Sequence, residues 1–374
     1  MIYLDYAANT PVAPQVLEDY INCERTYIAN PNSAHPLGTS ARHKMAEIID
    51  KVASELKIDA TGIIFTSGAS EANNTAIKGI ARARRNVGKH IVSTPLEHPS
   101  VSGPLTYLQE QGWEIDLVDI GRDGKIDVEH MKKLVRKDTV LIAVTVVDSE
   151  LGTIQPIDQI IEIKKQSLNC ALHVDATQAI GKIPFSFDGI DTASFTAHKF
   201  YGLNGIGVLY KDHSVVIEPL IHGGSGASLY RSGTPTLALV ASLERAARES
   251  MGNLTEQYAR IKQLNEYLRE VLSKYPAVRI NSPADAVPHI LNLSVSGVKG
   301  TRFRDALADL GVCVSVKSAC STDGTPSRAV YAVSRDRKNA LSSWRISLSH
   351  LTTGEEINQF LEAFATCYRK LVSG

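Results

Sequence analysis

Short β-rich runs alternate with amphipathic helical stretches between residues 62 and 210, and this alternation is the strongest constraint on the fold. The run TVLIAVTVV at 139–147 is almost continuously apolar, as expected of a strand that is buried on both faces. Repeated β-α-β order implies parallel strands joined by right-handed crossovers. We therefore predict an α/β fold with a mainly parallel, doubly wound sheet, whose strands are 62–66, 89–93, 113–118, 139–147, 170–174, 192–196 and 206–210. Amphipathic spacing predicts helices over 71–84, 100–111 and 128–137.

The pattern changes near residue 235. A long helical stretch runs from about 236 to 274, with an expected break at Gly252 and Asn253. Short strands and helices follow it, which predicts a smaller α+β unit with strands 278–282, 289–295, 312–316 and 344–349 and helices 301–310 and 355–372. We divide the chain into an N-terminal segment that packs on the small domain, a large domain and a small C-terminal domain, with the bounds 1–15, 16–250 and 251–374.

The charge balance narrows the classes of partner. Lys and Arg total 40 and Asp and Glu total 40, so the net charge is zero, which argues against nucleic acid or an anionic membrane as the main partner. Apolar runs stay well short of the ~20 residues of a membrane span. The start MIYLDYAANT lacks the basic and apolar regions of a signal peptide, so we expect a cytoplasmic protein. The five cysteines are widely spaced without a CxxC pair, so we expect neither a disulfide framework nor a metal site.

Ligands of open α/β sheets bind at the carboxyl ends of the strands, so the residues after each predicted strand are candidates for a site. Thr66-Ser67-Gly68-Ala69-Ser70-Glu71 would offer backbone N–H groups at a helix start to an anion, or would only cap the helix. Asp175 could pair with a protonated ring nitrogen, or cap the next helix. Lys199 could act as a sheltered amine nucleophile, or lie in a surface loop. His98 could stack on a ligand or transfer protons, or be structural.

Cys320 is the one cysteine in a run of small and turn-forming residues, Ser318-Ala319-Cys320-Ser321-Thr322-Asp323-Gly324. Such a loop makes a thiol accessible, and the basic Lys317 and Arg328 would stabilise its thiolate. The alternative is an inert thiol. Each of these features is weak alone, but they occur in one order along the chain, together with Arg231-Ser232-Gly233-Thr234 and Arg345 in a predicted strand.

In that order, the motifs resemble those of the class V (fold type I) pyridoxal-phosphate enzymes, and within them the cysteine desulfurases of the NifS/IscS kind. The resemblance covers nearly the whole chain. It is carried by YLDYAANTP (3–11), NPNSAH (30–35), FTSGASEANN (65–74), LEHPSV (96–101), HVDATQAIGKIP (173–184), SFTAHKFYGLNGIGVLY (194–210), HGG (222–224), RSGT (231–234), SAC (318–320) and RISL (345–348).

The resemblance implies a role for each matching residue. Lys199 would hold pyridoxal phosphate as a Schiff base in the large domain, and Asp175 would pair with the ring nitrogen. His98 would stack on the ring and help to move protons. The other cofactor contacts would be Ala69, Ser70, Ser149, Gln178, Thr196 and His198, with Thr234 reaching the partner subunit's cofactor in a homodimer. Asn30, His35 and Arg345 would bind the substrate, with Arg345 on its carboxylate, and Cys320 on the small domain would attack its sulfur.

Two positions depart from the family pattern. Ser149 stands where the family has the second Asn of NNExG, so a direct hydrogen bond to the cofactor is expected to be lost. Lys317 replaces a Gly in the SSGSAC motif, which alters how the cysteine loop leaves its strand. Ser70 replaces the usual Thr but keeps the hydroxyl group.

The function implied is desulfuration of L-cysteine to L-alanine, with a persulfide formed on Cys320 and passed to a sulfur-acceptor protein, for example in iron–sulfur cluster assembly. Two alternatives stay open. One is a pyridoxal-phosphate lyase that acts on cysteine, cystine or selenocysteine without a persulfide relay. The other is a weakly active homologue that serves as an interaction partner.

Overall fold

A seven-stranded sheet forms the centre of the computed structural model, which describes residues 1–224, 228–317 and 324–372. All neighbouring strands pair in parallel except β8, which runs antiparallel to both of its neighbours. The predicted mainly parallel, doubly wound sheet is therefore confirmed, and each strand lies within two residues of its predicted bounds. The order across the sheet is β2 (Ile63–Thr66), β8 (Gly207–Lys211), β7 (Thr192–Thr196), β6 (Ala171–Asp175), β5 (Thr139–Thr145), β3 (His90–Ser93) and β4 (Glu114–Leu117).

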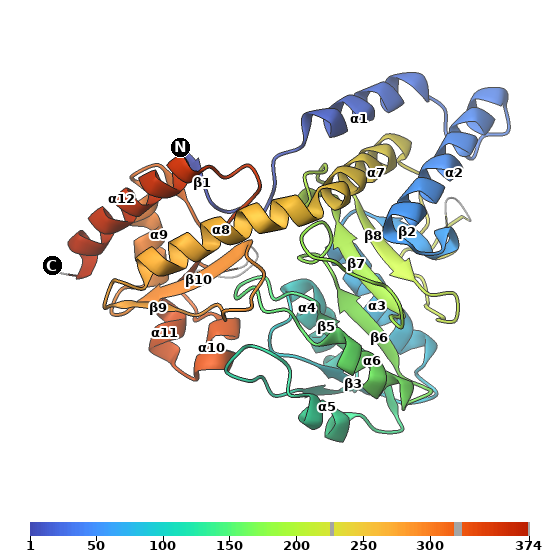
Figure 1. Ribbon diagram of the computed structural model, residues 1–374. Helices are drawn as coiled ribbons and strands as arrows, with labels where there is room; N and C mark the ends of the chain where they lie inside the picture. The colour runs from blue at the N-terminus through green and yellow to red at the C-terminus, as the bar shows by residue number, and fades with distance from the viewer. Residues whose placement is uncertain (225–227, 318–323, 373–374) are drawn as a thin grey trace.

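Helices cover both faces of this sheet (Figure 1). Side chains of β5 alternate between them: Leu141 and Ala143 pack against α3 and α4, whereas Ile142 and Val144 face the opposite core. The first face is covered by α3 (Ala69–Ala83) and α4 (Pro99–Glu110), and the second by α5 (Val128–Leu134), α6 (Ile157–Lys165), α7 (Leu237–Gly252), α1 (Pro14–Thr26) and α2 (Pro36–Leu56). Our strand and helix assignment from the sequence did not include α1, α2 or α6. Two short 3-10 helices complete this part, η1 (Ala60–Gly62) and η2 (Ala197–Lys199).

A second hydrophobic core lies beyond residue 253. Trp344 and Phe303 are fully buried and stack with their ring centroids 5.2 Å apart, and Phe360 and Phe364 surround them. Its elements are a sheet of β12 (Ser343–Ser347), β10 (Ile290–Val295) and β9 (Val278–Ile280), and the helices α8 (Leu254–Leu272), α9 (Gly300–Ala308) and α12 (Gly354–Val372). The short helices α10 (Arg328–Ser334) and α11 (Arg337–Ser342) place their buried apolar residues in the first core. The long α8 follows α7 after the predicted break and extends from the large sheet to the small one (Figure 1).

The N-terminal segment joins the two parts of the chain. Its strand β1 (Ile2–Tyr3) pairs in parallel with β11 (Val312–Cys313), and Asp5 forms a bridge with Ser347 of β12. β11 is shorter than the predicted strand 312–316, and Ser315 instead forms an isolated bridge with Arg345. Within the described residues, every helix is too short or too polar to cross a lipid bilayer.

The close approach of β8 to the start of α3 requires glycine at position 207. A Cβ atom there would lie 2.6 Å from Cα of Gly68 and 2.9 Å from the backbone oxygen of Phe195. Gly68, with φ of 155°, is the N-cap of α3 and has no side chain that could move away. This contact therefore sets where the N-terminus of α3 lies.

We predict that Gly207→Ala lowers the free energy of unfolding by about 1–3 kcal/mol, because backbone atoms must shift to admit the methyl group. Chemical denaturation measures this change. Gly103→Ala is the matched control, since a Cβ atom at Gly103 meets no atom within 4 Å. An unfolding curve of Gly207→Ala that coincides with that of the wild-type protein would contradict the packing argument.

Candidate active site

A cavity of about 330 Å³ opens at the carboxyl ends of β5, β6 and β7. It lies where the switch-point rule for open α/β sheets places a ligand. The structure brings to it most of the predicted site residues: Ala69, Ser70, His98, Ser149, Asp175, Gln178, Thr196, His198, Lys199 and Arg345. Ala7, Ala8, Ser67, Gly68, Glu71, Leu96, Ser100, Thr145, Val147 and Thr177 complete its lining.

The start of α3 forms one end of the cavity. Gly68 and Ala69, at the N-terminus of this 15-residue helix, line the cavity, and the helix dipole favours an anion at this point. Thr196 and His198 face the same cavity from the end of β7, and Thr196 Oγ1 lies 3.1 Å from His198 Nδ1. Burial, with the charge of Lys199 as the next cause, lowers the pKa of His198 to about 4, so its imidazole is neutral at pH 7. The hydroxyl, neutral imidazole and backbone groups suit a phosphate-sized anion.

Asp175 ends β6 and projects its carboxylate into the cavity, where only 5% of the residue is exposed. Its Oδ2 accepts a hydrogen bond from Asn73 Nδ2 at 2.9 Å, and its Oδ1 accepts one from the Thr177 backbone N–H at 3.0 Å. These two donors fix the orientation of the carboxylate. Asp175 is therefore held where it can pair with a cationic group of a ligand.

Asn73 is a functional residue that our sequence reasoning missed. It is fully buried in α3, and all of its hydrogen-bonding capacity is used. Its amide nitrogen donates to Asp175 and, at 2.8 Å, to Ser100 Oγ, while its oxygen accepts from His173 Nε2 at 2.9 Å and from Ser194 Oγ. Because the oxygen accepts from Nε2, His173 is a neutral donor at that nitrogen, and burial lowers its pKa to about 4.

His98 is tied to the same network through Ser100. Its Nδ1 accepts the Ser100 backbone N–H at 3.1 Å as the N-cap of α4, and lies 2.8 Å from Ser100 Oγ. This contact leaves the proton of the neutral ring on Nε2. Burial lowers the pKa of His98 below its ordinary value, although Asp175 opposes that shift. His98 thus presents a neutral, oriented imidazole to the cavity.

Lys199, in η2 directly after β7, reaches the cavity beside the N-terminal segment. Its Nζ donates to the backbone oxygens of Ala7 at 2.9 Å and Ala8 at 2.6 Å. Gln178 Nε2 donates to the same Ala7 oxygen at 2.9 Å. A segment from the far end of the chain therefore positions the candidate nucleophile.

Arg345, on β12 of the small sheet, also lines the cavity, and only 2% of the residue is exposed. Its Nη2 lies 2.9 Å from Asp5 Oδ1, and its Nη1 donates to the backbone oxygen of Ser149 at 2.6 Å. Ser315 Oγ donates to the other oxygen of Asp5 at 2.7 Å. Arg345 Nε has no hydrogen-bond partner among the described residues. The guanidinium is thus fixed in place and keeps donors for a carboxylate ligand.

Two buried acids lie behind the cavity wall, and the sequence motifs did not single them out. Burial, together with the nearby charges of Asp175 and Asp148, raises the pKa of Glu97 to about 8. Burial likewise raises the pKa of Asp148 to about 7, with Glu150 as the next cause. Glu97 Oε1 accepts hydrogen bonds from Thr94 Oγ1 at 2.7 Å and from the Thr145 backbone at 3.0 Å. Glu97 is therefore mostly protonated at pH 7, which keeps a further negative charge away from Asp175.

Cys320 lies outside the described residues, but both flanks of its segment are described. Lys317 Nζ donates to the Thr325 backbone oxygen at 2.9 Å and to Thr325 Oγ1 at 2.7 Å, so the two flanks meet. They line a pocket of about 80 Å³ together with His98 and Ser149, which also line the main cavity. Cys23, Cys170 and Cys367 are buried, and burial raises the pKa of each thiol, to about 12 for Cys170.

Of the predicted site residues that the structure describes, three are not among those that line the cavity in this single chain. Asn30 and His35 lie in the connection between α1 and α2, where His35 Nδ1 accepts the Gly38 N–H at 3.2 Å as a helix cap. Thr234 lies in the loop before α7. Their proposed roles toward substrate and partner subunit stay predictions.

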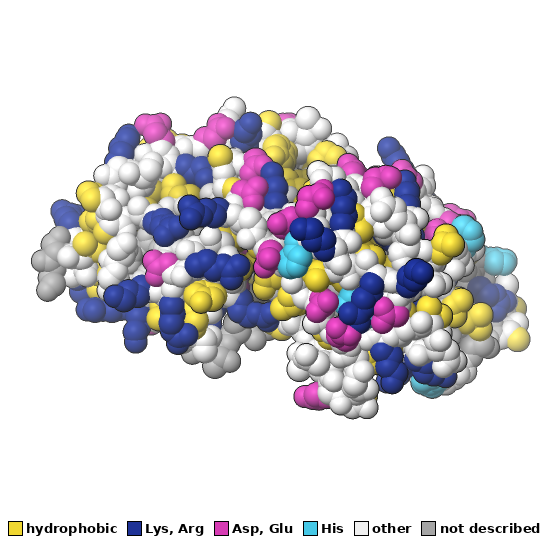
Figure 2. Space-filling model, turned by 90° about the horizontal axis from the view of Figure 1, so that it is seen from below, with side chains coloured by type: hydrophobic (Ala, Val, Ile, Leu, Met, Phe, Trp, Pro, Cys, Tyr) yellow, Lys and Arg dark blue, Asp and Glu magenta, His cyan; other side chains and the backbone are white. Residues whose placement is uncertain are grey.

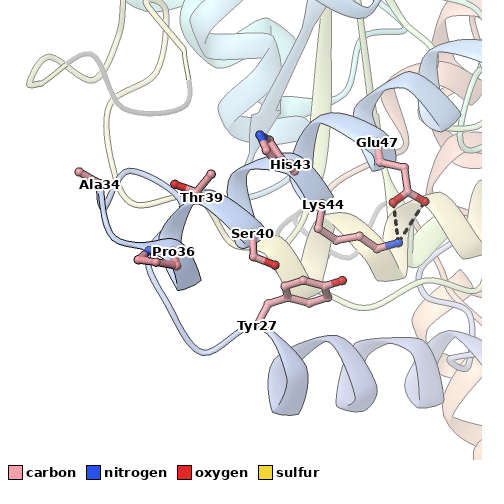
Figure 3. Close-up of a pocket in the computed structure, with 8 residues that line it drawn as sticks. All are labelled: Tyr27, Ala34, Pro36, Thr39, Ser40, His43, Lys44 and Glu47. Carbon is pink, nitrogen blue, oxygen red and sulfur yellow. Dashed lines mark hydrogen bonds and ion pairs between the residues drawn. The ribbon is translucent and has the colours of Figure 1, made fainter.

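A wider and more open hollow, of about 630 Å³, lies beside Tyr27 and the first turns of α2 (Figure 3). Its cation Lys44 is already paired with Glu47 at 3.0 Å. It contains none of the predicted site residues, so we place the chemistry in the smaller cavity. Among the described residues, no group of three His, Cys, Asp or Glu side chains is arranged to hold a metal ion.

Comparison with known proteins places this geometry in a family. The model of the aminotransferase class-V family matches residues 2–360. A NifS/IcsS protein homolog of Lactobacillus delbrueckii subsp. bulgaricus is 36% identical over 99% of this chain and 97% of its own length. A cysteine desulfurase IscS of Dictyoglomus turgidum is 36% identical over 99% of this chain and 95% of its own length.

Solved structures agree with the sequence comparisons. A NifS-like protein superposes with a TM-score of 0.93 at 33% identity, covering 99% of this chain and 100% of its own. A structure described as SspA in complex with cysteine superposes with a TM-score of 0.82 at 29% identity, covering 94% of this chain and 100% of its own. The resemblance seen in the motifs is confirmed, and the chain belongs to the aminotransferase class-V family, among the proteins of the NifS/IscS kind.

Proposed function

We propose that this protein is a pyridoxal-phosphate-dependent cysteine desulfurase, which converts L-cysteine to L-alanine and transfers the sulfur to Cys320. The observation that carries the proposal is the meeting of Lys199 and Asp175 in one cavity, with His98 and Arg345 around them. The full-length similarity to proteins named cysteine desulfurase supports it.

The residues present fit pyridoxal phosphate. The N–H groups at the start of α3, with Ser70, Thr196 and His198, would hold the phosphate. Asp175, oriented by hydrogen bonds from Asn73 and Thr177, would hold the protonated ring nitrogen, and Lys199 Nζ would bind the aldehyde carbon. When bound, the cofactor supplies an electron-withdrawing ring that takes up the electron pair released at the substrate α-carbon.

Residues of the chain itself would bind the cysteine substrate, transfer its proton and accept its sulfur. Arg345 would bind the α-carboxylate with its remaining donors, while Asp5 and the Ser149 backbone keep the guanidinium oriented. Lys199 Nζ would take the α-proton and return a proton to the product. The Cys320 thiolate would attack the substrate sulfur, so that an S–S bond forms and the carbon–sulfur bond breaks. Alanine leaves, and the sulfur stays on Cys320 as a persulfide.

The geometry around the flanks of Cys320 supports a sulfur relay. Lys317 and Thr325 line a small pocket that shares His98 and Ser149 with the main cavity, so these described residues on either side of Cys320 lie beside the main cavity. From there the persulfide would pass to an acceptor protein.

We predict that the wild-type protein, loaded with pyridoxal phosphate and given L-cysteine with a thiol reductant, forms alanine. Cys320→Ser should keep the cofactor absorption band and lose alanine formation by at least about a hundredfold, because the sulfur acceptor is removed. Lys199→Ala should lose both. Alanine and pyruvate are quantified by chromatography, and mass spectrometry locates the added sulfur.

Cys170→Ser, at a buried thiol, is the matched control and should turn over cysteine like the wild-type protein. Pyruvate and ammonia as products, or wild-type turnover by Cys320→Ser, would replace the relay with the elimination reaction. A wild-type protein that shows no cofactor band after reconstitution would contradict the proposed function as a whole.

We further propose that the protein acts as a homodimer, in which Thr234 reaches the partner subunit's cofactor. The absence of Thr234 from the lining of this single chain's cavity is consistent with that role. Light scattering should give about twice the chain mass of 40.6 kDa, and a monomer under assay conditions would contradict the proposal.

A further inference from the structure

Lys182 is a buried lysine beside the cavity to which no role has been given above. It follows the 176–181 turn after β6, and only 7% of it is exposed. Within the part of the chain that the structure describes, no carboxylate forms an ion pair with it. A buried ammonium without a counter-ion is costly, so such a side chain needs an explanation beyond packing.

Among the described residues, the side-chain hydrogen bond of Lys182 leads directly to the cavity. Its Nζ donates to Oε1 of Gln178, which lies one helical turn earlier in the sequence and lines the cavity. The other end of the same amide, Nε2, donates to the Ala7 backbone oxygen at 2.9 Å. Lys199 Nζ donates to that same Ala7 oxygen at 2.9 Å.

These contacts allow only one orientation of the Gln178 amide. If the amide flipped, its oxygen would face the Ala7 oxygen, which is an unfavourable contact between two acceptors. Lys182 would at the same time lose the oxygen to which it donates. In the observed orientation, Nε2 has a second hydrogen beyond the one given to Ala7, and this donor is available to a ligand in the cavity.

We propose that Lys182 is a positioning residue, which fixes the side-chain amide of Gln178 so that an N–H group, and not an oxygen, faces an oxygen of the cofactor. This inference rests on the proposed function. It concerns a residue that acts through Gln178 and does not itself line the main cavity.

The electrostatic surroundings of Lys182 agree with this role. Burial keeps the pKa of Lys182 far below its ordinary value, and the charges of Lys199 and Arg345 lower it further. The Nζ–H donor to Gln178 is present whether the amine is charged or neutral. Lys182 and Lys199 also line one small space of about 10 Å³ with the buried His289, so a charged Lys182 would repel the candidate nucleophile.

The test is a titration of the cofactor-free protein with pyridoxal phosphate, followed by its absorption spectrum. Lys182→Met keeps the length of the side chain and removes the donor. It should raise the dissociation constant about tenfold and shift the cofactor band, since the ligand loses an oriented hydrogen bond. Lys182→Gln restores an N–H donor and should bind more tightly than Lys182→Met.

Lys211→Met is the matched control. Lys211 is also buried and donates to backbone oxygens, those of Asp212 at 2.9 Å and Val215 at 2.8 Å, but it lies outside the cavity. Its substitution should leave the affinity and the spectrum unchanged. A loss of affinity in both variants would show that removal of any buried lysine has this effect, and would overturn the proposal.

A double variant tests whether Lys182 acts through Gln178. Gln178→Leu removes the amide, so adding Lys182→Met should weaken binding no further. Additive losses, or wild-type titration by Lys182→Met, would overturn the inference. A wild-type protein that does not bind pyridoxal phosphate would instead contradict the proposed function, so the two failures are distinguishable.

Discussion

The hydrogen bond between Asn73 and Asp175 is the interaction on which the rest of the site depends. A carboxylate that is 5% exposed at the end of a central strand would lose most of its hydration without compensation. Asn73 and the Thr177 N–H replace that hydration. Since Asn73 also bonds Ser100, and through it His98, one buried amide aligns groups from α3, α4 and β6 around a single cavity.

The N-terminal segment makes the second connection. Its β1 strand is anchored on β11, its Asp5 orients Arg345, and its carbonyl groups at Ala7 and Ala8 receive Lys199. Arg345 on the small sheet and Lys199 after the large sheet are therefore both positioned by this one N-terminal segment.

The surface charge is unevenly distributed, although the chain has no net charge. Figure 2 shows Lys and Arg side chains gathered over one end of the molecule and a more mixed distribution elsewhere.

The sequence predicted the sheet well because apolar β-rich runs and their order along the chain are local signals. It did not predict α1 and α2. Only Val16 and Cys23 are buried in α1, so its apolar periodicity is faint. β11 is shorter than the predicted strand 312–316, because its pairing with β1 ends at Cys313. The partner strand lies 310 residues earlier in the chain, so local sequence does not indicate where the pairing ends.

The predicted cavity residues were found by family motifs and by their positions after strands. The sequence did not assign Asn73, Glu97 or Lys182 to the site, because their side-chain hydrogen bonds are visible only in the folded chain. Asn73 and Glu97 bond distant segments, and Lys182 bonds Gln178. A polar residue on the apolar face of the helix 71–84 was the available signal for Asn73. Asn30, His35 and Thr234 are not among the residues that line the main cavity of the single chain, so their roles stay predictions.

The affinity of Asn73→Ala for pyridoxal phosphate, measured by absorption titration, tests the central claim most directly. Our account predicts a dissociation constant at least about tenfold above that of the wild-type protein, because Asp175 loses a donor and His98 loses its tie to the network. Asn74→Ala is the neighbouring control, since Asn74 bonds only the Ser70 backbone within the described residues. Equal affinity of Asn73→Ala and wild type would contradict the account.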